Sequence, residues 1–291
     1  MAMAIVGAVI SGCGSGPNQV GSAAIIGPDA VSLTQVQSRI DAALSKTDVV
    51  AQLAVRGVGA DDIARDVVTR AIMHDLLERT AATEGLTVTD AQIDQELTAV
   101  GGTDALLRSS LHDRDSLRQR VRDQLLAVEL AKRYVDRLNV VVDIVAAPSR
   151  ADAEAKARAI AAGGAAADAA FRTNAQRDLP FRAAADPEAA SMALFGTPAG
   201  QIVVFQPAPS QSGWLVLKVV QRTIDAAATD PSAVSRIDET TLAKIGERLL
   251  QPLSQELGVR VNPRYGVWDP IQMRVVAAGH QAGSIITPAA G

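Results

Sequence analysis

The sequence is poor in the residues that most often carry chemistry or covalent cross-links. It has one cysteine and three histidines in 291 residues, and aromatic residues make up only 3% of the chain. A single cysteine excludes a disulfide within the chain. Because aromatic side chains are scarce, the core must be built mainly from Ala, Val, Leu and Ile, which suits a largely helical protein.

Motifs for catalysis, nucleotide binding and metal binding are also missing. The chain has no G-x-S-x-G elbow, P-loop, G-x-G-x-x-G fingerprint or H-E-x-x-H sequence. None of the three histidines, His74, His112 and His280, stands at a defensible metal-ligand spacing from another His, a Cys or a triplet of carboxylates. The sequence therefore predicts no cofactor, no metal and no conventional catalytic residue, and leaves noncovalent binding as the expected mode of action.

The charge pattern argues against nucleic acid as a partner. The net charge is −4, and no basic stripe with interleaved aromatic residues occurs. Binding to a phosphate backbone depends on such a concentration of Lys and Arg.

The N-terminal segment resembles a bacterial lipoprotein signal. Residues 1–10, MAMAIVGAVI, are apolar but too few to span a bilayer as a helix, and they lead into the lipobox-like sequence Ile10-Ser11-Gly12-Cys13. The resemblance implies lipid attachment at Cys13 and a membrane-anchored protein on the extracytoplasmic face, in the periplasm or cell envelope. No Lys or Arg precedes the apolar run, and the alternative interpretation of Cys13 is an incidental thiol.

Capping signals and apolar spacing define the expected elements after residue 21. A short strand at 22–26 ends at a Gly-Pro-Asp turn, and Ser32 with Gln35 has the spacing of a helix capping box. Further helices are expected from 61 to Gly85, after the Thr89–Gln92 capping box, and from about 115 to 138.

The pattern changes to strands and helices after residue 138. We expect a strand at 140–145, an Ala-rich helix from 149, a loop at 178–188, and a hairpin of strands 202–205 and 214–220. A helix from about 234 to Gly258, a closing strand at 259–261 and 265–268, and a loose tail complete the chain.

Several segments resemble the SurA and PrsA-type foldases. Residues 23–44, AAIIGPDAVSLTQVQSRIDAAL, are similar to the opening strand, turn and helix of those proteins, and residues 257–266, LGVRVNPRYG, resemble their closing strand. The resemblance implies an α+β fold: a mostly helical chaperone module built from both chain ends, with a small parvulin-like α+β domain inserted. The implied division is a signal and tether (1–21), the first part of the module (22–138), the parvulin-like domain (139–225), the helix and strand completing the module (226–269) and a flexible tail (270–291).

The catalytic residues of parvulins do not carry over to the middle domain. Asp143 or a neighbouring Val stands where the first-strand histidine belongs, Leu215 stands at the last-strand histidine, and Pro187 replaces an aromatic residue of the proline pocket. The resemblance therefore implies a degenerate isomerase domain. A weak prolyl isomerase with a divergent pocket remains as an alternative.

The predicted function is that of an ATP-independent chaperone that binds unfolded, exported polypeptides. Flexible and apolar side chains of the helical module are the candidates for client binding, with a core position as the alternative for each. These candidates are Met73, Leu76, Leu77, Leu97, Leu106, Leu107 and Leu111. A third possibility is a structural envelope lipoprotein that docks one folded partner.

Overall fold

The computed structural model describes residues 19–207, 213–228, 230 and 232–288. The predicted lipobox residues Ile10, Ser11 and Gly12 and the predicted lipid-attachment residue Cys13 lie outside these ranges. None of the helices that the structure describes combines the length and apolar character needed to cross a membrane.

The first elements follow the sequence signals closely. Strand β1 (Ser22–Ile26) is buried along its whole length and turns at Gly27, where φ is +57°, into β2 (Asp29–Ser32). Ser32 caps helix α1 (Leu33–Leu44) by accepting a hydrogen bond from the Gln35 backbone N–H at 3.3 Å. The predicted strand, turn and capped helix are therefore confirmed.

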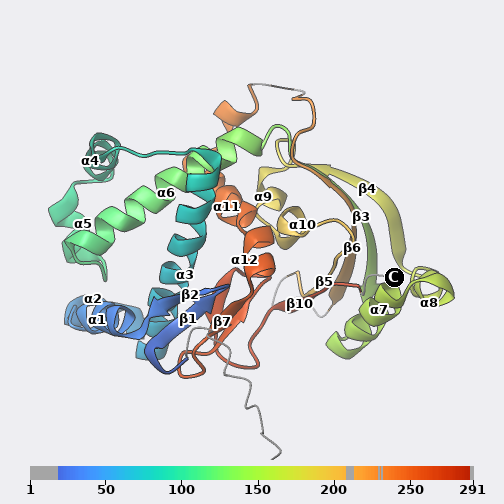
Figure 1. The fold of residues 1–291 in the computed structure, drawn as a ribbon, viewed down its shortest axis with the longest axis horizontal. Helices are drawn as coiled ribbons and strands as arrows, with labels where there is room; N and C mark the ends of the chain where they lie inside the picture. The colour runs from blue at the N-terminus through green and yellow to red at the C-terminus, as the bar shows by residue number, and fades with distance from the viewer. Residues whose placement is uncertain (1–18, 208–212, 229, 231, 289–291) are drawn as a thin grey trace, which may run out of the picture.

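Five more helices build the body of the N-terminal half (Figure 1). They are α2 (Thr47–Val55), α3 (Ala60–Glu84), α4 (Asp90–Ala99), α5 (Thr103–Ser109) and α6 (Arg114–Tyr134). Gly85 ends α3 in the left-handed conformation, with φ of +65°, and the Thr89–Gln92 capping box opens α4 as predicted. Helix α2 was not expected, because Lys46 at its N-cap gives no side-chain capping signal.

The two ends of the chain come together in one small sheet. Strand β7 (Val259–Val261) pairs antiparallel with β1, which lies between β2 and β7. Beyond the strand, the Asn262 side chain donates to the Ser22 carbonyl at 3.0 Å. The closing strand that the sequence predicted is therefore confirmed, and the helical module is assembled from segments far apart in the sequence.

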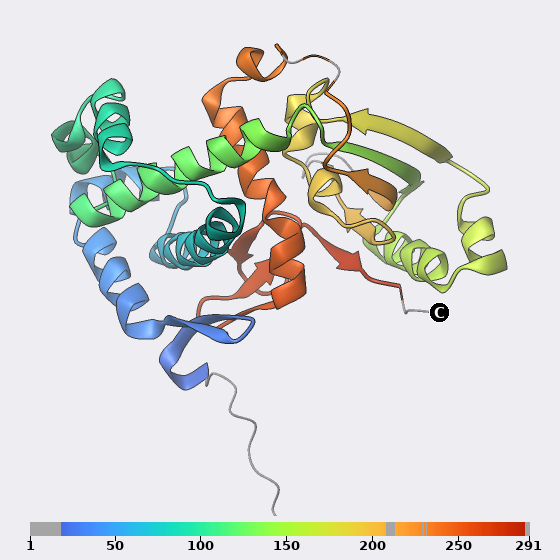
Figure 2. The ribbon, with the colours of Figure 1, turned by 45° about the horizontal axis from the view of Figure 1, so that its top comes forward.

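Helix α11 (Glu239–Leu249) provides the second tie between the ends, because it packs along α6. Gly246 makes the close approach possible: a Cβ at this position would lie 1.9 Å from the Ala127 carbonyl oxygen. Helix α12 (Gln251–Leu257) continues from α11 to β7. Figures 1 and 2 show α11 and α12 between the N-terminal helices and the large sheet of the middle domain.

The middle domain is a five-stranded sheet with order β10-β5-β6-β3-β4. Its strands are β3 (Asn139–Ala147), β4 (Ala175–Arg182), β5 (Ile202–Phe205), β6 (Trp214–Thr223) and β10 (Gly283–Ile286). Helix α7 (Arg150–Ala162) covers one face, and α8 (Gly164–Ala170) follows it. The predicted hairpin of β5 and β6 is confirmed.

Two expectations for this sheet are corrected. The stretch predicted as a loop at 178–188 contains most of β4, an edge strand in which Pro180 stands opposite Val141. The tail predicted to be flexible, 270–291, forms β9 (Arg274–Val276), which pairs with β8 (Val267–Asp269), and then β10, which adds to the edge of β5. These strands were not predicted, because each is only three or four residues long and the tail is rich in Gly, Ala, Thr and Pro.

The middle domain and the helical module share one core. Two short helices, α9 (Pro187–Ala190) and α10 (Ala193–Gly196), lie between the sheet and α11. Phe195 of α10 is fully buried in the same apolar cluster as Ile245 of α11 and Leu217 of β6. The sheet face opposite α7 is thus packed against the helical module.

Candidate functional site

A cleft of about 380 Å³ lies in the helical module. It lies where α1, α3, α6 and α11 meet the connection between α5 and α6, so both chain ends contribute to its walls. Its apolar lining consists of Ala43, Val67, Met73, Leu77, Leu111, Ala243 and Leu250. This volume is within the range of sites that bind small molecules or a few peptide side chains.

The candidate client-binding residues fall into three groups. Met73, Leu77 and Leu111 line the cleft. Leu76 and Leu97 are buried in the core, with exposed fractions of 0% and 2%. Leu106 and Leu107 are half-buried on α5, pack against the core, and are not part of the cleft wall.

Charged side chains complete the cleft wall. Arg39 of α1, Arg70 of α3, Arg120 of α6 and Lys244 of α11 are the basic residues, and Asp123 of α6 and Glu247 of α11 are the acidic ones. The sequence analysis did not single out these cations, because their elements are scattered along the chain and only the fold brings them together. The lining of the cleft therefore combines apolar side chains with more basic than acidic ones.

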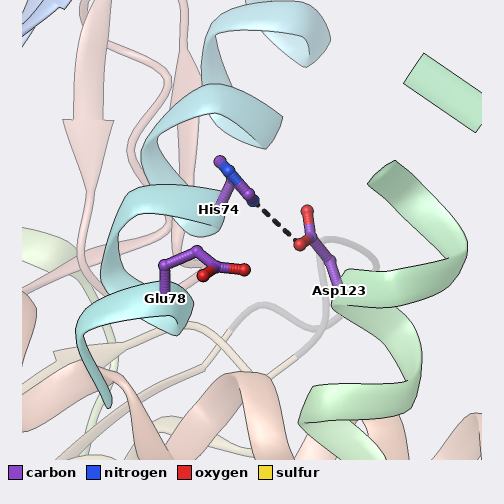
Figure 3. Close-up of side chains that lie close together, drawn as sticks. All are labelled: His74, Glu78 and Asp123. Atoms are coloured by element: carbon purple, nitrogen blue, oxygen red, sulfur yellow. Dashed lines mark hydrogen bonds and ion pairs between the residues drawn. The ribbon is translucent and has the colours of Figure 1, made fainter. Parts of the chain in front are cut away.

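His74, Glu78 and Asp123 form a polar cluster beside the cleft, in which the side chains of α3 point toward that of α6 (Figure 3). His74 Nδ1 lies 2.8 Å from a carboxylate oxygen of Asp123, and Arg122 pairs with Glu78 at 3.1 Å. Burial of the imidazole opposes its protonation, but the hydrogen bond and negative charge of Asp123 outweigh burial and raise the pKa of His74. Burial likewise raises the pKa of Asp123.

This cluster is the one group of His, Asp and Glu side chains, among the residues that the structure describes, whose ligand atoms could share a cation. The three ligand atoms lie within 4.8 Å of one another. The His74 and Glu78 spacing of i, i+4 is the only signal in the sequence, since Asp123 comes from another helix. Each side chain already has a protein partner, so we assign the cluster to ion pairs that join α3 to α6.

His112 is the second histidine of the cleft wall and is only 8% exposed. Burial lowers its pKa to about 4, and the positive charges of Arg70 and Arg120 act in the same direction. The imidazole is therefore neutral in the folded protein at neutral pH, whereas an unfolded histidine has a pKa of about 6.5.

His112 is expected to make the protein less stable in mild acid. Below pH ~6.5 His112 binds a proton in the unfolded state, whereas in the folded state it does so only near pH 4. The contribution of neutral His112 to the free energy of unfolding is therefore complete above the unfolded-state pKa and is lost as the pH falls through the folded-state pKa. At pH ~5 the expected loss of unfolding free energy is about 2 kcal/mol. Urea unfolding of the wild-type protein and of His112→Gln at pH ~7.5 and ~5 measures it.

Comparison with His112→Gln isolates the contribution of His112, because His74, whose pKa is shifted in the opposite direction, is present in both proteins. His112→Gln is expected to lose less stability on acidification than the wild type. Equal losses in the two proteins would contradict the assignment.

The middle domain lacks the histidines that parvulins place in their first and last strands. Residues 139–225 include neither histidine nor cysteine. Asp143 is buried, pairs with Arg177 at 3.0 Å and accepts the Asp178 backbone N–H at 2.9 Å, so it fixes the irregular pairing of β3 with β4. Leu215 stands on β6 opposite Phe205 and Ala146.

Comparison with protein families identifies the middle of the chain. Residues 129–234 match the family model described as the PPIC-type PPIASE domain. This segment therefore contains a parvulin-type domain, as predicted from its order of elements. No curated protein matches the chain.

Among solved structures, the chain is similar to two PrsA proteins. It is 16% identical to the peptidylprolyl isomerase PrsA from Bacillus anthracis, covering 66% of this chain and 97% of that chain with a TM-score of 0.25. It is 12% identical to the foldase protein PrsA from Streptococcus pneumoniae, covering 81% of this chain and 94% of that chain with a TM-score of 0.27. The predicted likeness to parvulin-containing foldases is confirmed for the segment that the family model matches.

Proposed function

We propose that this protein is an ATP-independent chaperone that holds unfolded, exported polypeptides in the cleft of its helical module. The observation that carries the proposal is the cleft itself, which has apolar residues in its lining and is formed by helices from the N-terminal half together with α11. Half-buried Met73 and Leu111 expose apolar surface there without belonging to the fully buried core.

The expected binding is weak and reversible. Burying one large aliphatic side chain contributes about 1.5–3 kcal/mol, and the cleft has room for only a few such groups. After the entropy lost by an unfolded segment is subtracted, affinities of about 1 µM to 1 mM follow. Such affinities suit a holdase, which must release its clients.

Polar replacement of the cleft lining is expected to weaken holding. In a light-scattering assay of an unfolded outer-envelope protein, the Cys13→Ser chain should suppress aggregation, and adding Met73→Gln with Leu111→Gln should raise the required molar excess about fivefold or more. The reason is that client side chains would then bury against amides, at a cost of roughly 1–3 kcal/mol per unpaired polar group.

The matched control replaces two apolar residues that lie outside the cleft. Val55 and Val100 are 90% and 51% exposed, and their change to Gln should leave suppression unaltered. Circular dichroism and thermal unfolding establish that both double variants fold. Equal suppression by both double variants, or none by the parent chain at several-fold excess, would remove the proposal.

A weak prolyl isomerase activity is the second candidate, favoured by the family match. The face of the sheet opposite α7 is packed against the helical module, and twisting a prolyl bond with a barrier of about 20 kcal/mol requires an accessible pocket. A protease-coupled assay with a proline peptide decides between the two activities. A rate above buffer that survives the cleft variant would establish catalysis in the middle domain.

A lipid anchor at Cys13 would keep the chaperone where exported chains emerge. Two or more acyl chains give stable anchoring, whereas one chain is marginal. Labelling cells with an acyl-lipid precursor should mark the wild-type protein and not Cys13→Ser. Cross-linked pull-down then separates a chaperone with many unfolded clients from a structural lipoprotein that docks one stoichiometric partner.

A further inference from the structure

The positive charge of the cleft is local and does not reflect the chain as a whole. Four cationic side chains reach the cleft from four separate helices, α1, α3, α6 and α11, although the protein has a net charge of −4. Two carboxylates, Asp123 and Glu247, face the same space. Asp123 is already held by His74, so Glu247 is the carboxylate left to oppose four cations.

These cations have hydrogen-bonding capacity to spare. The side chains of Arg120 and Lys244 are exposed and have no hydrogen bond or ion pair within the described ranges of the chain. Arg39 donates one hydrogen bond, to Gln119 at 2.7 Å, and Arg70 pairs with Asp66 at 2.9 Å. A guanidinium has five N–H donors, so both arginines can also engage a ligand carboxylate.

The lowered pKa of His112 follows in part from the same cations. This imidazole lies in the cleft wall, and after burial the largest influences against its protonation are the charges of Arg70 and Arg120. A potential that disfavours a proton on His112 favours an anion in the adjacent space.

We propose that the cleft selects client segments in which Asp or Glu side chains flank apolar ones. The apolar residues would pack on Met73, Leu77 and Leu111, while the flanking carboxylates would pair with Arg120 of α6 and Lys244 of α11. Basic segments of equal hydrophobicity would be rejected, because a Lys placed between these cations meets like charge. The proposal rests on the proposed chaperone function and names its preferred client class.

The test uses three peptides that share one leucine-rich sequence and carry Glu, Gln or Lys at the same flanking positions. Each has blocked termini and a neutral nitrobenzoxadiazole fluorophore, and binding to the full Cys13→Ser chain is followed by fluorescence anisotropy. The Glu peptide is expected to bind about tenfold more tightly than the Gln peptide, and the Lys peptide more weakly than both. Salt at about 0.5 M should reduce the preference severalfold, because it screens charges beyond a few ångströms.

Arg120→Gln combined with Lys244→Gln is expected to reduce the Glu-over-Gln preference to less than twofold, with little change for the Gln peptide. The matched control, Arg172→Gln with Arg260→Gln, removes two exposed cations that do not line the cleft and should keep the preference. If all three peptides bind wild type equally, or the Lys peptide binds best, the charge preference is overturned while the chaperone function stands. If none of them binds, the proposed function itself fails.

Discussion

Replacing Gly246 with alanine is expected to destabilise the protein by about 3 kcal/mol, although the same change in an exposed helix interior would stabilise it by about 1 kcal/mol. The added Cβ would lie 1.9 Å from the Ala127 carbonyl oxygen, so α11 and α6 would have to move apart. The obstacle is backbone, and no rotamer change can relieve it. Urea or thermal unfolding followed by circular dichroism measures the loss.

Gly213 provides the control for this experiment. A Cβ there meets no atom within 4 Å and the backbone is not left-handed, so Gly213→Ala should be nearly neutral. An unchanged midpoint for Gly246→Ala would mean that the two helices are not held at this distance. Because both helices line the cleft, the variant should also bind peptide less tightly.

Replacing Arg248 with methionine is expected to cost about 3–5 kcal/mol and to loosen the middle domain from the helical module. The guanidinium of Arg248 donates to the Ser191 carbonyl at 2.8 Å, to the Gln251 side chain at 2.6 Å and to the Ile271 carbonyl at 3.0 Å. Methionine retains the apolar stem and leaves three acceptors without these donors. Burial lowers the pKa of Arg248 to about 10, so the charge is nevertheless kept at neutral pH.

Hydrogen exchange tests whether Arg248→Met loosens the middle domain from the helical module. Amides of the segment around α9 and α10 should exchange faster in Arg248→Met, because the side chain ties that segment to α11. Arg114→Met is the control, since Arg114 is 64% exposed and pairs with Asp104 at 3.5 Å, an interaction worth at most about 1 kcal/mol. Equal effects of the two substitutions would argue against Arg248 as the link between the domains.

Local signals in the sequence were sufficient for most of the helical module. Ser32, Thr89 and Gly85 mark helix ends through interactions within a few residues, and such interactions can be read from spacing alone. The pairing of β1 with β7 required the resemblance to known foldases, because nothing in a five-residue strand specifies a partner so far along the chain.

The missed elements share a physical cause. Strand β4 contains Pro180 and follows Asn174, whose φ is +53°, so its sequence is typical of a loop, and it is tolerated as a strand because it lies at the sheet edge. Strand β10 begins at Gly283, where a Cβ would lie 1.9 Å from the Val204 carbonyl oxygen. In both cases the partner strand, and not the local pattern, determines the structure.

The same contrast holds for the cleft. Hydrophobicity singled out Met73, Leu77 and Leu111 together with Leu76 and Leu97, but only the fold separates residues that line a cavity from residues that fill a core. The convergence of Arg39, Arg70, Arg120 and Lys244 had no signature in the sequence, because it depends on how four helices are placed.

The position of β1 between β2 and β7 has a consequence for how the molecule is made. Its neighbour β7 is synthesised long after β1, so a chain that emerges N-terminus first cannot complete this sheet, or the cleft wall supplied by α11, until the residues between these strands are free. Contacts between such distant segments slow folding. A nascent chain would therefore stay open in this region, and the cleft would form only after α11 and β7 have emerged.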